Sequence, residues 1–242
     1  MSRAGLIDLS GTKPCGLPLR QPLYGPGPYQ YRDDRCLLLV YESDEDALLE
    51  VLPRELEPMD GNLVVMCFID CPEVNDMGPH NFAMPCIPVR YGDYAGQFVP
   101  YLYTSTDASL ACYREVQGWP AVLGETTLTA GDGQIRARVT RGGRAVMEAS
   151  AEIGGEAITS LDFLPIILYK EIATLDGQRR EVAYLETSTS RFEKISFQGG
   201  AGTLAFHGDE RVARLRVREV KQALYGTMDD FYPETIRVLH RY

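Results

Sequence analysis

The chain has 242 residues, of which 45% are hydrophobic and 10% aromatic, enough to build the core of one large domain over residues 1–242. Its 34 acidic and 24 basic residues give a formal charge of −10, which repels nucleic-acid backbones and anionic lipids, so we expect neither nucleic acid nor membrane as a partner. No stretch is typical of a targeting signal, and apolar runs such as Cys36 to Tyr41 are too short to span a membrane, so a cytoplasmic protein is expected.

The amino-terminal part predicts an arm, a short helix and several strands. Residues 1–27 are rich in Gly and Pro and are typical of an extended arm. Ser43 is a candidate N-cap for a short helix that Pro53 ends. Strands bounded by Gly, Pro, Asn or Asp are expected at 35–41, 63–70, 85–91 and 97–103.

A second helix is expected over 107–117, begun by Thr106 or Asp107 and closed by Gly118. After it the pattern favours strands, beginning with a hairpin of 134–140 and 144–150 around Gly142-Gly143. Further strands are expected at 162–173, 181–190, 192–198, 202–207 and 211–220. Many strands with two or three short helices indicate a large, closed or nearly closed antiparallel sheet.

Two clusters in this sequence have simple structural interpretations. The glycines of Gly199 to Gly202 are expected in a hairpin turn, because they open into a strand-like segment and not into a helix. The basic run from Arg211 to Lys221 alternates with apolar residues from Arg214 to Arg218 and indicates the solvent face of a strand.

The general catalytic and metal-binding motifs are missing. There is no phosphate-binding loop, no nucleophile elbow and no pair of histidines at helical spacing. Cys67, Cys71, His80 and Cys86 were the one combination worth testing for zinc, but their spacing matches none of the usual patterns. We therefore expect reduced thiols, no metal and no cofactor.

Four segments, taken in order, resemble the acetoacetate decarboxylase superfamily. The third segment in chain order resembles the family's stretch of G-R-E, an aromatic residue and P-K, and the fourth segment resembles the family's L-K-x-I-P-x-x-D-G stretch. The first is Gly27 to Tyr29 with the strand and the stretch Asp44 to Glu57 that follow, and the second is Ile87 to Gly92 with the strand Gln97 to Tyr103. The third is Cys112 to Glu125, and the fourth is Tyr169 to Gly177. The resemblance implies a mainly β (α+β) fold, a β-cone or barrel with a few short helices around an apolar pocket, and a homo-oligomer.

The family's chemistry, as the resemblance implies it, uses a lysine amine that forms an imine with a ketone substrate. The pKa of that amine is depressed by an apolar pocket and a second cation. In this sequence the two positions after Pro120 are Ala121 and Val122, neither of which can form an imine. Lys170 is the best candidate for a relocated reactive lysine, although it matches a position that the family carries alongside its own.

Other positions that resemble the family's pocket residues also differ. Where the family has a basic residue after G-P-Y, the chain has Asp34, and a one-residue slip would place Arg35 there instead. The two acidic pocket positions fall on Met66 and Phe82. We expect these changes to leave a larger and more apolar cavity, suited to a hydrophobic small molecule.

Three functions remain open from the sequence. The first is an enzyme without imine chemistry, a cyclase, isomerase or lyase of a secondary metabolite; the second is a non-catalytic binding protein; the third is a decarboxylase that uses Lys170. The residues expected to have catalytic roles are Arg114, Glu115, His80 and Tyr113, and Arg114 and Glu115 have a helix-anchoring ion pair as their structural alternative. The residues expected to bind substrate are Asp34, Met66, Phe82, Tyr101, Trp119, Ala121 and Val122.

Overall fold

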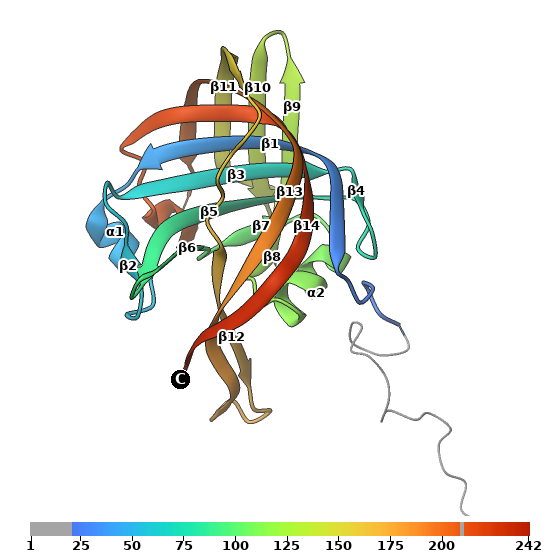
Figure 1. Cartoon of the computed structure of the whole chain (residues 1–242), viewed down its shortest axis with the longest axis vertical. Helices are drawn as coiled ribbons and strands as arrows, with labels where there is room; N and C mark the ends of the chain where they lie inside the picture. Colours follow the sequence, from blue (N-terminus) through green and yellow to red (C-terminus); the bar gives the residue numbers. More distant parts are fainter. Residues whose placement is uncertain (1–20, 209–210) are drawn as a thin grey trace, which may run out of the picture.

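The computed structural model describes residues 21–208 and 211–242, and all of its strands belong to one sheet (Figure 1). The strands are β1 (Tyr29–Glu42), β2 (Glu57–Pro58), β3 (Leu63–Cys71), β4 (Glu73–Val74), β5 (His80–Tyr91), β6 (Tyr94–Phe98), β7 (Leu102–Thr104), β8 (Ala121–Leu123), β9 (Glu125–Gly131), β10 (Gln134–Arg141), β11 (Arg144–Ile158), β12 (Ile166–Ala173), β13 (Arg180–Phe206) and β14 (Glu219–Arg241). The helices are α1 (Glu45–Leu49), α2 (Asp107–Glu115) and the 3-10 turn η1 (Arg211–Arg214). No helix among these residues is long and apolar enough to cross a membrane.

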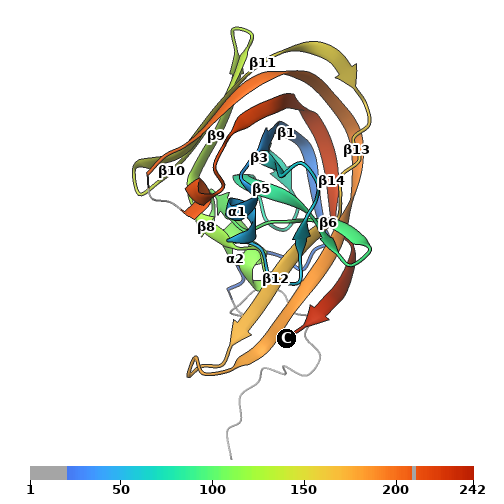
Figure 2. The same ribbon diagram turned by 90° about the vertical axis from the view of Figure 1, so that its left-hand side faces the viewer.

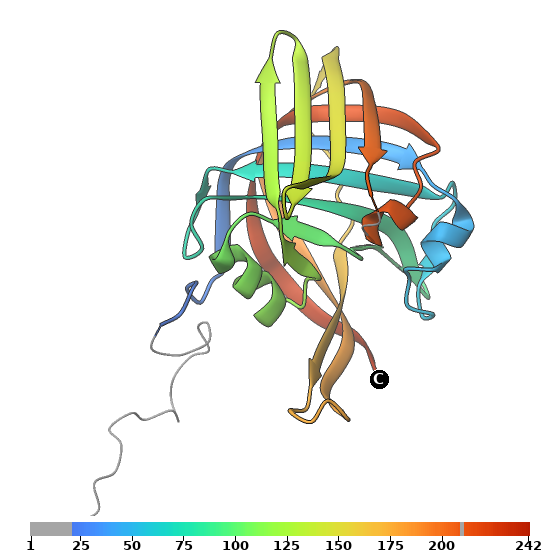
Figure 3. The ribbon, with the colours of Figure 1, turned by 180° about the vertical axis from the view of Figure 1, so that it is seen from behind.

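The sheet closes part of itself into a ring. Its main path runs β12-β6-β5-β3-β1-β14-β13-β11-β10-β9, and β12 also pairs with β13, so the strands from β12 round to β13 form a closed circuit of pairings. Figure 2 shows the long strands β13 and β14 curving around β1, β3 and β5. Beyond the circuit, β9, β10 and β11 extend the sheet, and α2 lies beside β8 (Figure 3).

The curved sheet separates two apolar cores because side chains alternate between its faces. On β1, Leu37 and Leu39 belong to one core, whereas Cys36 and Leu38 belong to the other. The first core also contains Phe68 and the apolar residues of β10 and β11. The second core, toward α2 and β8, surrounds the cavity described below.

The prediction of a mainly β fold with a few short helices is confirmed. Helix α2 begins after Thr106, whose hydroxyl accepts a hydrogen bond from Ser109 N at 3.2 Å, and Gly118 adopts a positive φ of 71° just beyond its end. The predicted hairpin forms as β10 and β11, turning at Gly142 and Gly143. Of the predicted arm, residues 21–27 form no helix or strand, and residues 1–20 lie outside the described residues.

Two predicted strands are wrong in their extent. The segment 97–103 is divided between β6 and β7, with Pro100, which lacks an N–H group to donate to a ladder, between them. The basic run predicted as a strand at 211–220 forms η1 and a loop, and strand β14 starts only at Glu219. In this loop Arg216 and Arg218 form ion pairs with Asp44 at the start of α1.

The glycine cluster at 199–202 was wrongly predicted as a turn. It lies inside β13, which runs without a break through the three strands predicted at 181–190, 192–198 and 202–207. A Cβ added at Gly200 would lie 2.0 Å from the carbonyl oxygen of Glu152 on β11. These glycines therefore allow neighbouring strands to approach where the sheet bends.

Gly226 on β14 is under the same constraint, and we expect Gly226→Ala to destabilise the fold by about 2–4 kcal/mol. An added Cβ would lie 2.0 Å from Ser196 O and 2.6 Å from Phe197 Cα, backbone atoms that cannot rotate away. Gly154→Ala on β11 is the control, because nothing lies within 4 Å of its added Cβ. Urea unfolding of both variants measures the difference, and equal stability would contradict this account of the bend.

Candidate active site

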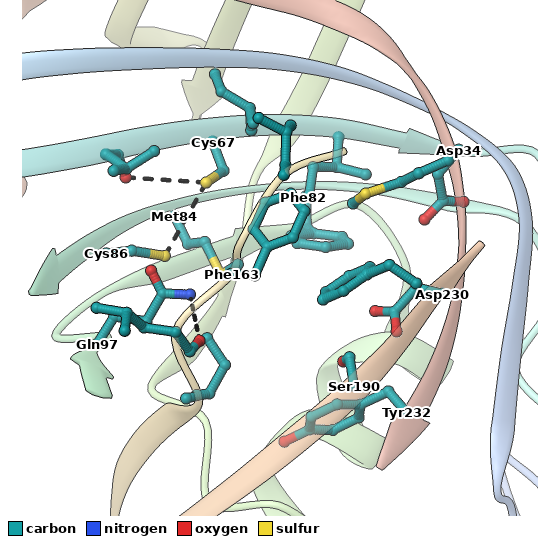
Figure 4. Close-up of a pocket in the computed structure, with 18 of the residues that line it drawn as sticks. Asp34, Cys67, Phe82, Met84, Cys86, Gln97, Phe163, Ser190, Asp230 and Tyr232 are labelled. Atoms are coloured by element: carbon teal, nitrogen blue, oxygen red, sulfur yellow. Dashed lines mark hydrogen bonds between the residues drawn. The ribbon is translucent and has the colours of Figure 1, made fainter. Parts of the chain in front are cut away.

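A cavity of about 260 Å³ lies in the second core (Figure 4). It is bounded by strands β1, β3, β5, β13 and β14, by the loop between α2 and β8, and by the segment 161–166 that leads into β12. Most of its lining is apolar and includes Leu38, Ile69, Phe82, Met84, Phe163 and Phe192. Such a cavity suits an apolar small molecule with few polar contacts.

Successive side chains of a strand point to opposite faces of the sheet, so every second residue of a strand can reach the cavity. Asp34 and Leu38 come from one face of β1, and Cys67 and Ile69 come from one face of β3. Cys67 and Cys86 both line the cavity, with their Sγ atoms 4.0 Å apart. Within the described residues, no three His, Cys, Asp or Glu side chains gather in a way that could hold a metal ion.

Asp34 is a buried carboxyl group in an apolar wall. Only 2% of the residue is exposed, and its Oδ1 has no hydrogen-bond partner. Burial raises the pKa of Asp34 to about 8, and the negative charge of Asp230 adds to the rise, while Cys71 opposes it. The group is therefore mainly a neutral acid at pH 7, able to donate a proton.

Asp230 is the second carboxyl group at the cavity. It lies on β14, the neighbour of β1, and its Oδ1 is shielded from solvent without a partner. Burial raises the pKa of Asp230 to about 7, with Ser190 opposing the rise. Figure 4 shows the carboxyl groups of Asp34 and Asp230 on one side of the cavity, opposite Cys67 and Cys86. Near neutral pH Asp34 therefore mostly keeps its proton while Asp230 is partly ionised, so the two groups can act as an acid and a base.

A chain of hydrogen bonds runs behind this wall. His80 Nδ1 lies 3.0 Å from the carbonyl oxygen of Gly78, which can only accept, so Nδ1 carries the proton. Burial lowers the pKa of His80, which keeps the ring neutral, and its Nε2 therefore accepts from the Tyr113 hydroxyl at 2.8 Å. The Tyr31 hydroxyl in turn donates to Tyr113 across 3.3 Å. Both tyrosines line the cavity, whereas His80 does not and orients Tyr113 from behind.

The loop between α2 and β8 contributes Gln117 and Trp119 to the cavity. Gln117 is only 3% exposed, yet neither its Nε2 nor its Oε1 has a protein partner. The indole Nε1 of Trp119 is also buried without one. Together with the two carboxyl groups, these atoms supply the polar contacts of an otherwise apolar site.

The retained Arg114 and Glu115 do not line the cavity and instead hold this loop. Arg114 Nη1 donates to Ala121 O at 3.0 Å, and Glu115 Oε2 accepts from the Tyr24 hydroxyl at 2.7 Å. Their candidate catalytic roles, and the ion pair between them considered as an alternative, are thus replaced by separate anchoring contacts. Lys170 makes a similar anchoring contact with this loop, because its Nζ donates to Val116 O and its side chain packs against Gly118.

Four of the residues expected to bind substrate lie elsewhere. Met66 is on the opposite face of β3 and packs in the first core, because only the odd-numbered residues of that strand face the cavity. Ala121 is fully buried in the second core behind the cavity wall, and Val122, one residue on, packs against the first core. Tyr101 borders a separate cavity of about 300 Å³ together with Val51. Asp34, Phe82, Tyr113 and Trp119 do line the main cavity.

No lysine of residues 21–208 and 211–242 lines the cavity. Lys170 binds Val116 O as described, Lys194 pairs with Asp229 at 2.8 Å, and Lys221 pairs with Glu42 and Glu219. Lys13 lies outside the described residues. Arg35, the alternative to Asp34, also does not line the cavity and forms an ion pair with Asp70.

Sequence reasoning missed Tyr31, Gln117 and Asp230. Gln117 and Tyr31 lay within or next to segments that resembled the family, and their position there was the only signal that the sequence offered. Asp230 had no local signal, because it lies about two hundred residues from Asp34 along the chain and meets it only through the pairing of β1 with β14.

Comparisons with known proteins agree with this fold. The family model of acetoacetate decarboxylase matches residues 16–242. The chain is 28% identical over 222 residues to acetoacetate decarboxylase 1 of Bradyrhizobium diazoefficiens, with 88% of each chain covered. The crystal structure of acetoacetate decarboxylase from Legionella pneumophila superposes with a TM-score of 0.85 at 20% identity, covering 100% of this chain and 99% of that one.

A biosynthetic enzyme also has this fold. The enduracididine biosynthesis enzyme MppR, complexed with the condensation product of pyruvate and imidazole 4-carboxaldehyde, superposes with a TM-score of 0.80 at 18% identity, covering 96% of this chain and 99% of that one. Because the family model covers nearly the whole sequence, the chain belongs to the acetoacetate decarboxylase family.

Proposed function

We propose that this member of the family is an acid–base enzyme that acts on a mostly apolar small molecule without forming an imine on a lysine. The observation that carries the proposal is the pair of buried carboxyl groups, Asp34 and Asp230, in an apolar cavity that no lysine of the described residues lines. Their raised pKa values near 8 and near 7 make one a proton donor and the other a proton acceptor at neutral pH.

The reaction class that this arrangement supports is the movement of a proton within the bound molecule. The Asp230 carboxylate removes a proton from the substrate, and the neutral Asp34 carboxyl group delivers one to an oxygen or carbon that gains electron density. Bond migration, ring closure or elimination can follow from that exchange, so the product is that of an isomerase, cyclase or lyase. Proton transfer from Asp230 to Asp34 then restores the starting state.

The apolar lining supplies the rest of the catalysis. Side chains such as Phe82, Met84 and Phe163 hold a flexible substrate in a reactive conformation, and such positioning contributes about 7–11 kcal/mol in favourable intramolecular reactions. The hydrogen bonds from Tyr31 to Tyr113 and from Tyr113 to His80 fix the aromatic wall beside Asp34. MppR, with the same fold, is named as a biosynthesis enzyme, which supports a biosynthetic role for this chain.

The test is conversion of a natural compound. The protein is incubated with a metabolite extract of the organism that encodes it, and mass spectrometry follows which compounds bind and which change. We expect at least one apolar compound to be consumed, and an isomer or a smaller elimination product to appear. A compound that is retained in a one-to-one ratio and recovered unchanged would contradict catalysis and identify a binding protein.

The absence of imine chemistry has its own test. With acetoacetate and borohydride we expect the mass of this protein to stay unchanged, because Lys170 donates to Val116 O outside the cavity. Acetoacetate decarboxylase 1 of Bradyrhizobium diazoefficiens is the positive control and is expected to gain the reduced adduct. An adduct on Lys170, located by peptide mapping, would instead support the decarboxylase alternative.

A further inference from the structure

Most of the buried polar atoms that lack a protein partner gather at one place. They include Gln117 Nε2 and Oε1, Trp119 Nε1, and one carboxyl oxygen each of Asp34 and Asp230, all on residues that line the cavity. In the rest of residues 21–208 and 211–242, the only buried side-chain polar atoms without a partner are the hydroxyls of Ser43 and Thr126. Buried polar atoms are normally hydrogen-bonded, so this concentration points to a ligand that completes them.

Gln117 is distinctive because both ends of its amide are unpaired. The roles of Asp34 and Asp230 in proton transfer account for their free oxygens, but no such role exists for a carboxamide. An unpaired buried amide destabilises the folded chain, and a methionine or leucine would fill the same space without that cost. The side chain is 3% exposed and lines the cavity, so the cavity is where a partner for both atoms can come from.

The backbone around Gln117 is held in place. Trp119 N donates to Tyr113 O at 2.9 Å, and Arg114 donates to Ala121 O at 3.0 Å. Gly118 takes a positive φ, and a Cβ there would lie 2.7 Å from Lys170 Cβ. A fixed loop presents the amide at a constant position, which is the condition for selective hydrogen bonding.

We infer that Gln117 binds the polar end of the substrate as a paired donor and acceptor, and that the substrate is an apolar molecule that ends in a lactam or a primary carboxamide. The inference rests on the proposed function, because it takes the cavity as the substrate site. A cis amide presents N–H and C=O side by side, so its N–H donates to Gln117 Oε1 while its oxygen accepts from Nε2.

Other polar ends fit less well. An ester or a ketone offers no donor to Oε1, which would remain buried and unpaired. A carboxylate also lacks a donor, and it would be repelled by Asp230 once that group is ionised. Lactams and primary amides are neutral and satisfy both atoms of Gln117.

The experiment compares two probes that differ in one group. The lactam δ-decalactam and the lactone δ-decalactone share ring size and alkyl tail, but only the lactam has an N–H donor. Trp119 is the sole tryptophan of the chain and lines the cavity, so its fluorescence reports binding directly. We expect the wild-type protein to bind the lactam about tenfold more tightly than the lactone.

Two variants make the result specific to Gln117. Gln117→Met removes both polar atoms at similar length and is expected to bring the lactam-to-lactone affinity ratio to about one. Thr126→Val is the matched control, because it removes a different unpaired buried polar group, a hydroxyl outside the cavity, and it should keep the wild-type ratio. We also expect Gln117→Met to unfold at a higher temperature than the wild type, whereas a purely structural role would lower it. Gln117→Leu provides the same comparison if the methionine variant does not fold.

The outcomes separate this inference from the proposed function. A ratio near one in the wild type, an unchanged ratio in Gln117→Met, or no saturable binding of either probe would overturn the recognition of lactams. None of these results depends on turnover, so conversion of a natural compound could still be observed. If instead the ratio behaves as expected and no compound is converted, the recognition stands and the acid–base function fails.

Discussion

Replacing Asp34 or Asp230 by asparagine is expected to lower turnover of the natural substrate by about 10²- to 10⁴-fold, the usual contribution of a positioned acid or base. Asparagine keeps the shape of a neutral carboxyl group but can neither donate nor accept the transferred proton. Because burial raises the pKa of both groups, a neutral side chain is tolerated at either position, so the variants should fold and still retain the compound. The measurement is the rate of conversion by mass spectrometry, together with binding followed through Trp119 fluorescence.

Asp229→Asn is the control for this prediction. Asp229 is next to Asp230 on β14 but lies outside the cavity, where it pairs with Lys194 and accepts from Asp33 N. We expect its turnover to stay near that of the wild type. An equal loss in Asp229→Asn, or full activity in Asp34→Asn, would show that the two carboxyl groups do not carry the chemistry.

The pH profile of turnover identifies the two roles. The active form needs Asp230 ionised and Asp34 protonated, so the wild-type rate should rise with a pKa near 7 and fall with a pKa near 8. Asp34→Asn should remove the alkaline limb from its residual activity, and Asp230→Asn should remove the acidic limb. A profile that keeps both limbs in both variants would assign the proton transfers to other groups.

The stability of the protein is expected to fall as pH rises from about 4 to about 8. The pKa of Asp34 is about 8 in the folded chain but about 3.9 when unfolded, so between these values the unfolded state releases a proton that the folded state keeps. Each pH unit in that window lowers the free energy of unfolding by about 1.4 kcal/mol. Asp34 alone therefore removes about 5 kcal/mol by pH 8, and Asp230 acts in the same direction up to about pH 7.

Urea unfolding at pH 5 and pH 8 measures this slope. Asp34→Asn should flatten it and be more stable than the wild type at pH 8, because the amide never ionises. Asp229→Asn should instead be less stable than the wild type at neutral pH. Burial raises the pKa of Asp229, but the interactions with Asp33 N and Lys194 outweigh it and lower the pKa below its usual value, so the carboxylate stabilises the fold. A wild-type protein equally stable at pH 5 and pH 8 would mean that Asp34 is ionised in the folded chain.

The retained family residues have a common explanation in this structure. Arg114, Glu115 and Lys170 look like catalytic remnants in the sequence, but each makes a contact that holds the loop carrying Gln117 and Trp119. In this structure the contacts of these three side chains are therefore structural.

The sequence by itself determined the features that depend on neighbours along the chain. The cap at Thr106, the stop near Gly118 and the hairpin at Gly142-Gly143 follow from backbone preferences within a few residues, and all three are present. The overall resemblance of ordered segments was enough for the fold class. The sequence also showed that neither residue directly after Pro120 carries an amine, because the identity of a side chain does not depend on its surroundings.

Only the tertiary structure decided which side chains meet in the cavity. The alternation of β3 turned Met66 to the other core, and the pairing of β1 with β14 brought Asp230 beside Asp34. The glycines of β13 are conformational breakers in isolation but allow close packing where strands bend together. Burial raises the pKa of both carboxyl groups, and the charge of Asp230 adds to the rise at Asp34. Register, burial and charge proximity join residues far apart in the chain, and no local pattern encodes them.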